Sequence, residues 1–148
     1  MVLIAYHTRS LIRAAARRAT YEPKTAFYGE GMLPMNSNHI DPDTERAIRY
    51  FLNLIADRYD ITGAILYGSR ARRTHRADSD ADVAVLLKGE HQRFLTTKLE
   101  MADIAFDVLL QTGILISPLP IWLDEWEHPE TYSNPLLLHN INREGVRL

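Results

Sequence analysis

The sequence predicts an α+β domain, because segments with strand composition and segments with helical spacing follow one another along most of the chain. Residues 61–67 and 81–87 are apolar runs bounded by Gly, Asp or Lys, as strands are. Residues 93–110 instead repeat apolar side chains every three or four positions, which indicates a helix. The chain has 148 residues, 46% of them hydrophobic, which is enough for one core. We therefore expect a single folded domain.

The first 40 residues differ from the remainder. Residues 1–31 contain five Lys or Arg side chains against two Glu. The apolar start, residues 2–6, is too short for the h-region of a secretory signal. We interpret residues 1–40 as a basic, flexible extension and residues 41–148 as the folded domain. A role of the extension in gripping a partner stays open.

The domain is predicted to begin with a helix from Asp41 to about residue 57. Asp41 is a typical N-cap, and the proline that follows it suits the first helical position. The apolar stripe of this helix is typical of a core face: Ala47, Ile48, Phe51, Leu52, Leu54 and Ile55. Two strands follow, residues 61–67 and 81–87, and Gly89 ends the second.

The second half is predicted to contain helix, strand and helix. Apolar side chains at helical spacing mark residues 93–110, and Gly113 closes that helix: Leu95, Leu99, Ala102, Ala105 and Leu109. Residues 114–121 form a third strand, in which Pro118 and Pro120 lack N–H donors. We expect the far end of this strand to be an edge or to leave the sheet.

The C-terminal tail has clear helix signals and two tryptophans. Asn134 and the proline after it resemble a helix start, and Gly145 a helix end. Trp122 and Trp126 lie among acidic residues and are interpreted either as core that covers the sheet edge or as a surface that faces a partner.

The segment between the first two strands carries the chemistry. Gly68 and Ser69 follow the first strand, ten residues intervene, and Asp80 and Asp82 open the second. Residues two apart on a strand share one face, so the two aspartates point the same way, with Cα atoms roughly 6.5 to 7 Å apart. Two such carboxylates repel each other unless a cation lies between them. The spacing predicts a divalent metal site of the kind that carries nucleotide phosphates.

The turn before the aspartates favours phosphate. Gly68 can take positive φ without penalty, and Ser69 offers a hydroxyl and an N–H at the start of a short helix over residues 70–74. Positive charge lies beside it: Arg70, Arg72, Arg73 and Arg76. Each feature has a plainer interpretation, since Asp-x-Asp is also typical of a solvated strand end and an arginine run of an exposed helix face. Together they favour a phosphate site.

The pattern Gly-Ser, ten residues, Asp-x-Asp between two apolar strands resembles the signature of the polymerase-beta-type nucleotidyltransferase superfamily, and the small size resembles its minimal branch. The resemblance covers residues 41–148 and implies a small mixed β-sheet with helices packed on it. It implies that Gly68 and Ser69, with Arg70 beside them, bind the nucleotide. Asp80 and Asp82 would be the catalytic residues that bind Mg²⁺.

The resemblance also implies a reaction and a partner. Members transfer a nucleoside monophosphate from a triphosphate to an acceptor hydroxyl with Mg²⁺, and we expect AMP from ATP here. In many minimal members the partner is a HEPN-domain toxin, which the nucleotidyltransferase adenylylates as its antitoxin. We expect a protein acceptor, since so short a chain has little room for a domain that seats an antibiotic or a tRNA.

One departure from the family pattern concerns a third acid. The family has an acidic residue on the strand after the next helix, whereas residues 114–121 contain only Ser117 as a polar side chain. A neutral hydroxyl is a poor ligand for a hard cation compared with a carboxylate. Four acids lie near in sequence and leave a displaced ligand open: Asp103, Asp107, Asp124 and Glu125. A catalytically weak protein that neutralises a partner by binding is therefore the alternative function.

Composition excludes several other classes. Lys and Arg total 17 against 19 Asp and Glu, so the net charge of −2 gives no general attraction to nucleic acid. The chain has no cysteine, which suits a reducing cytoplasm, and no apolar stretch of the ~20 residues a membrane span needs. The six histidines show no metal-ligand spacing, and the Walker lysine is missing after Gly68. We expect a cytoplasmic protein with neither nucleic acid nor membrane as a partner.

Overall fold

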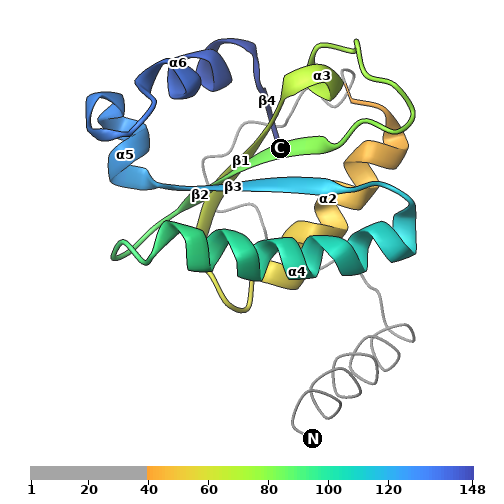
Figure 1. Ribbon diagram of the computed structural model, residues 1–148, viewed down its shortest axis with the longest axis horizontal. Helices are drawn as coiled ribbons and strands as arrows, with labels where there is room; N and C mark the ends of the chain where they lie inside the picture. The colour runs from red at the N-terminus through yellow and green to blue at the C-terminus, as the bar shows by residue number, and fades with distance from the viewer. Residues whose placement is uncertain (1–39) are drawn as a thin grey trace, which may run out of the picture. The chain divides into compact units, whose positions relative to one another are not determined.

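The computed structural model describes residues 40–148, and this part contains a four-stranded mixed sheet with strand order β3-β2-β1-β4 (Figure 1). The strands are β1 (Ile61–Tyr67), β2 (Ala81–Leu87), β3 (Ile116–Trp122) and β4 (Val146–Arg147). β1 runs antiparallel to β2 and β4, while β2 runs parallel to β3. The predicted α+β class with a small mixed sheet is confirmed.

Helices cover both faces of the sheet. The helical elements are α2 (Pro42–Ile55), α3 (Gly68–Ala71), α4 (Phe94–Thr112), α5 (Leu123–Glu127), the 3₁₀ turn η3 (Pro129–Thr131) and α6 (Pro135–Glu144). α2 and α4 pack on one face, and α5 and α6 lie on the other (Figure 1). Because β2 and β3 are parallel, the chain needs a long crossover between them, and α4 supplies it.

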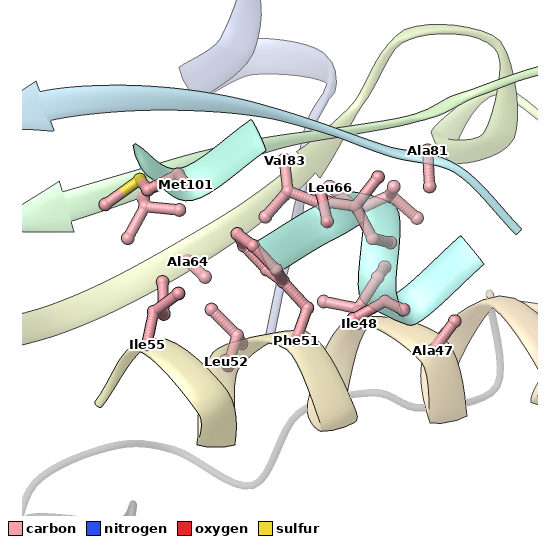
Figure 2. Packing of buried hydrophobic residues seen from close by; sticks show 14 of the residues in the cluster. Ala47, Ile48, Phe51, Leu52, Ile55, Ala64, Leu66, Ala81, Val83 and Met101 are labelled. Atoms are coloured by element: carbon pink, nitrogen blue, oxygen red, sulfur yellow. The ribbon is translucent and has the colours of Figure 1, made fainter. Parts of the chain in front are cut away.

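The start and the core face of α2 follow the sequence prediction. The Asp41 carboxylate accepts a hydrogen bond from the Thr44 N–H at 2.9 Å, which satisfies one of the free donors of the first turn. Figure 2 shows Ile48 and Phe51 of α2 pointing at the underside of the sheet, towards Val83. Burying each such side chain stabilises the fold by about 1.5–3 kcal/mol.

The α4 helix exists as predicted, and Gly113 ends it in the left-handed region at φ +76°. Of the five apolar positions that marked this helix in the sequence, only Ala105 is fully buried. The buried residues are Thr97, Met101, Ala105 and Val108, whereas Leu95 and Leu99 are exposed. Apolar residues lie on both sides of this helix, so spacing alone does not say which side faces the sheet.

The second face of the sheet is smaller and holds the C-terminal elements. Leu138 and Ile141 of α6 are buried there against Ile65 and Leu119 of the sheet. Trp126 is partly buried against this cluster, whereas Trp122 is buried in the cluster on the other face, in agreement with the interpretation of the tryptophans as core. The sequence did not predict α5, η3 or the two-residue strand β4.

The predicted basic extension lies outside the described residues except for Ile40. Ile40 is 8% exposed and belongs to the buried cluster on the α2 and α4 face of the sheet, which we call the α2 cluster.

β3 is an edge strand, as its prolines predicted, and both Pro118 and Pro120 remain in register with β2. Among residues 40–148, no helix combines the length and the apolar character needed to cross a bilayer.

Candidate functional site

A row of three polar side chains crosses one end of the sheet. Tyr67 on β1 pairs with Asp82 on β2, and Asp82 pairs with Ser117 on β3. Val83 points into the α2 cluster, so Asp82 shares the opposite face with Ala84, on the side of α5 and α6. The Ser117 hydroxyl is hydrogen-bonded to the Asp82 carboxylate. Three strands thus build one polar patch.

Gly68 lies directly against this patch. Its φ is +73°, a conformation that glycine adopts without penalty. A Cβ atom placed on Gly68 would lie 2.3 Å from Oδ2 of Asp82 and 3.2 Å from its Cγ. Any side chain there would therefore push the carboxylate away. Gly68 is required both for the backbone turn into α3 and for the close approach of that turn to Asp82.

The two predicted aspartates influence each other electrostatically. Asp80 is exposed just before β2, and Asp82 is partly buried on the strand. Burial and the negative charge of Asp80 raise the pKa of Asp82, while the Arg72 charge and the Ser117 hydrogen bond act in the opposite direction. Repulsion between two nearby carboxylates is what a divalent cation relieves. The pair therefore has the electrostatics of a cation site.

Tyr67 stays neutral beside the carboxylates. Burial, the Asp82 charge and the neighbouring Tyr132 together raise the pKa of Tyr67 to about 12. A phenol with this pKa keeps its proton at neutral pH, so it is a hydrogen-bond donor and not a base. Tyr67 closes the side of the patch that faces β1.

Arg70 has a different place from the one predicted. The residue is 6% exposed, and its Nη1 donates to Oγ1 of Thr44 at 2.7 Å. Its Nε and Nη2 both donate to the carbonyl oxygen of Ser79, at 3.0 and 2.8 Å, and Nη1 lies 3.7 Å from Oδ2 of Asp41. The guanidinium joins the start of α2 to the loop before Asp80. This speaks against a contact between the Arg70 side chain and the nucleotide.

Arg72 is the cation that faces the patch. Its charge lowers the pKa of Asp82, and its Nη1 lies 3.9 Å from Oε2 of Glu144 on α6. The side chain is 53% exposed, so it is free to turn towards an anion. Arg72, one of four arginines predicted to lie beside the turn, is thus the one whose charge acts on Asp82. Ser69 comes directly before Arg70 and is partly buried in α3.

One family model matches part of the chain. Residues 52–116 match the family model described as polymerase beta, nucleotidyltransferase, and the match contains Gly68, Ser69, Asp80 and Asp82. This segment is similar to polymerase-beta-type nucleotidyltransferase domains. The four residues thus lie inside the matched segment.

Two further comparisons add little to the nucleotidyltransferase assignment. A solved structure from Sulfolobus solfataricus, itself provisionally named a nucleotidyltransferase, shares 18% identity with a TM-score of 0.39, covering 68% of this chain and 85% of that one. A likeness this weak says nothing about a shared activity. No curated protein matches the sequence significantly.

None of the four acids near β3 completes the nucleotidyltransferase site. Asp103 and Asp107 belong to α4, on the face of the sheet opposite to Asp82. Asp124 and Glu125 follow Trp122, which pairs with Leu87 at the far end of β2. At about 3.3 Å per residue, that end is about 16 Å from Ser117. Ser117 is therefore the side chain that stands beside Asp82 on the third strand, and it carries no charge.

The remaining ligands of a metal would have to come from elsewhere. Within residues 40–148, no three His, Asp or Glu side chains are grouped so that they could hold an ion by themselves. Mg²⁺ characteristically binds through one or two carboxylates and completes its shell with water and substrate phosphate oxygens. Asp80 and Asp82 fit this mode, in which the ion arrives with a nucleotide. The Asp80 and Asp82 pair thus fits a metal whose other ligands are water and phosphate oxygens.

Sequence reasoning missed Tyr67, and it noted Arg72 and Ser117 without assigning them to this site. Arg72 was one of several arginines with no feature to distinguish it. A signal for Ser117 and Tyr67 did exist, since both are the polar residue at the end of an apolar strand. Their alignment with Asp82 depends on strand register.

Proposed function

We propose that this nucleotidyltransferase domain transfers AMP from ATP, with Mg²⁺, to a hydroxyl group of a partner protein, as the antitoxin of a HEPN-domain toxin. The observation that carries the nucleotide part is the contact of Gly68 with Asp82, which brings the glycine turn and the paired carboxylates into one site. The partner and the acceptor rest on the family resemblance.

Each residue of the site has a role in this proposal. The Gly68-Ser69 turn receives the triphosphate, because the glycine leaves room for phosphate oxygens beside its backbone. Arg72 neutralises phosphate charge from the α6 side. Asp80 and Asp82 would hold Mg²⁺, which supplies charge neutralisation at the phosphates when bound. Tyr67 and Ser117 orient Asp82 from the two neighbouring strands.

The reaction is a displacement at the α-phosphorus of ATP. The acceptor hydroxyl oxygen forms a bond to that phosphorus, the bond to the β-phosphate oxygen breaks, pyrophosphate leaves, and the hydroxyl proton passes to water. This chain contributes the fixed position of the α-phosphate, since orientation alone supplies much of the rate in such transfers. Arg72 offsets charge that builds up on the leaving group.

Titration calorimetry with ATP tests the nucleotide site. The wild-type chain is titrated with and without Mg²⁺, and Asp80→Asn/Asp82→Asn is titrated under the same conditions. We expect heat of binding only for the wild type with Mg²⁺. The matched control is Asp57→Asn/Asp60→Asn, which removes two exposed aspartates before β1, at the end of that strand away from Tyr67.

Binding that survives in Asp80→Asn/Asp82→Asn, or the absence of binding by the folded wild type, would contradict the nucleotide site. The transfer itself is followed with ATP labelled in the α-phosphate and a purified HEPN-domain partner. Label on the partner with the wild type, and none with the double variant, is the expected result.

The second candidate function is neutralisation of the partner by binding alone. The observation that favours it is the neutral Ser117 beside Asp82, together with the separation of the four nearby acids from the site. Co-expression with the toxin separates the two functions. Protection that persists with Asp80→Asn/Asp82→Asn indicates occlusion, whereas loss of protection by a folded variant indicates catalysis.

A further inference from the structure

The outer side of α4 carries a row of large apolar side chains that are more than half exposed. We call this row the α4 stripe. Its members are Leu95, Leu99, Phe106 and Leu110, with exposed fractions between 55% and 65%. Figure 1 shows α4 with no other described helix or strand over its outer side.

The spacing of the α4 stripe shows that it is one continuous surface. The four residues are separated by steps of four, seven and four positions, which place them on one side of a helix. The buried residues of α4, such as Met101 and Val108, lie on the opposite side. A helix that is apolar on both sides is normally buried on both. Within residues 40–148, the α4 stripe therefore has the character of a surface that packs against a further helix.

Acidic residues border the α4 stripe on one side only. Glu100, Asp103 and Asp107 follow one another at steps of three and four, and they form an acidic ridge beside the stripe. The Glu100 carboxylate accepts a hydrogen bond from the Tyr59 hydroxyl at 2.6 Å, which anchors it there. The other border has Lys98, 5.8 Å from the Phe94 ring. A partner would meet apolar side chains with negative charge along one edge.

We propose that the α4 stripe binds an amphipathic helix of a partner protein, whose apolar face is bordered by Lys or Arg. An apolar helix face in a groove or along another helix is a common recognition mode, and the acidic ridge selects basic flanks. A second copy of this chain fits less well. An antiparallel two-fold pair of α4 helices would set the two acidic ridges side by side, and like charges oppose that contact.

The α4 stripe is separate from the nucleotide site. α4 lies on the sheet face opposite to Asp82, so a helix bound there leaves the patch around Asp82 open. Partner binding through α4 is thus distinct from the chemistry proposed for the Asp80 and Asp82 pair. The inference does not rest on the proposed activity and can be tested without nucleotide.

Fluorescence anisotropy with two synthetic helical peptides tests the proposal. The peptides have the same leucine face, and their flanks carry either Lys or Glu. We expect the full chain to bind the Lys peptide and not the Glu peptide. Leu99→Ser/Phe106→Ser should weaken binding more than about tenfold, because two large apolar contacts are lost. Asp103→Lys/Asp107→Lys should reverse the preference and bind the Glu peptide.

Two matched controls separate the α4 stripe from general stickiness and charge. Leu136→Ser removes an apolar side chain that is 67% exposed on α6, and Asp57→Lys/Asp78→Lys changes the net charge equally elsewhere. Both should bind the Lys peptide like the wild type. Equal binding of the two peptides, or no loss in Leu99→Ser/Phe106→Ser, overturns the proposal. So does self-association in light scattering that the Leu99→Ser/Phe106→Ser change abolishes, since a second copy is then the occupant.

Discussion

Replacing Gly68 by alanine separates backbone strain from the contact with Asp82. A non-glycine residue at φ +73° costs about 1–2 kcal/mol. The new Cβ would also lie 2.3 Å from Oδ2 of Asp82, so the carboxylate must rotate away. Because the contacted atom ends a rotatable side chain, this adds about 1 kcal/mol. We expect Gly68→Ala to lower the free energy of unfolding by about 2–3 kcal/mol and to weaken binding of ATP with Mg²⁺.

Gly113 provides the matched control for this prediction. Its φ is +76°, and a Cβ there would meet nothing within 4 Å. Gly113→Ala should therefore cost only the backbone term, about 1–2 kcal/mol, and leave nucleotide binding unchanged. In an Asp82→Ala background, Gly68→Ala should cost no more than Gly113→Ala. Urea unfolding of the set gives the coupling energy between Gly68 and Asp82.

A coupling energy of zero between Gly68 and Asp82, together with full nucleotide binding by Gly68→Ala, would contradict this prediction. That result would mean that the turn and the carboxylate do not share one site. If Gly113→Ala also lost nucleotide binding, the loss in Gly68→Ala would be due to general destabilisation and not to displacement of Asp82.

Three further predictions concern the charges around the site. Arg70→Met should lower the free energy of unfolding by about 3–5 kcal/mol, because it removes a buried charge with several partners. Arg72→Met should change the free energy of unfolding by less than about 0.5 kcal/mol and instead weaken ATP binding. Equal effects of the two variants in urea unfolding and in calorimetry would contradict this difference. The pKa of Asp82 is raised in the folded state, so the metal-free protein should lose stability as the pH rises from the unfolded-state pKa through the folded-state pKa. Asp82→Asn should remove that loss. Urea unfolding in the presence of a chelator, over the acid pH range, measures whether stability falls in this way. Ser117→Asp should raise the affinity for Mg²⁺ and destabilise the metal-free fold by like-charge repulsion, and unchanged calorimetry would show that Ser117 does not face the metal.

Elements governed by a few neighbouring residues were predictable. The start of α2 follows from Asp41 and the proline beside it, and β1 and β2 follow from apolar runs with polar ends. The Gly68 turn and the Asp80 and Asp82 pair were found because their spacing reflects the period of a strand. α5 was missed, since none of its five residues is fully buried and no apolar period reveals them.

The sequence by itself predicted the α+β class and the resemblance to polymerase-beta-type nucleotidyltransferases, because strand and helix periods and turn residues act over a few positions. Tertiary structure alone decided which arginine faces the site, since Arg70 is bound to Thr44 and Ser79 while Arg72 approaches Asp82. It also decided which side of α4 is buried, because an apolar pattern on both sides of a helix leaves that choice to the sheet it packs against. Such choices depend on strand register and layer packing, which join residues far apart in the chain.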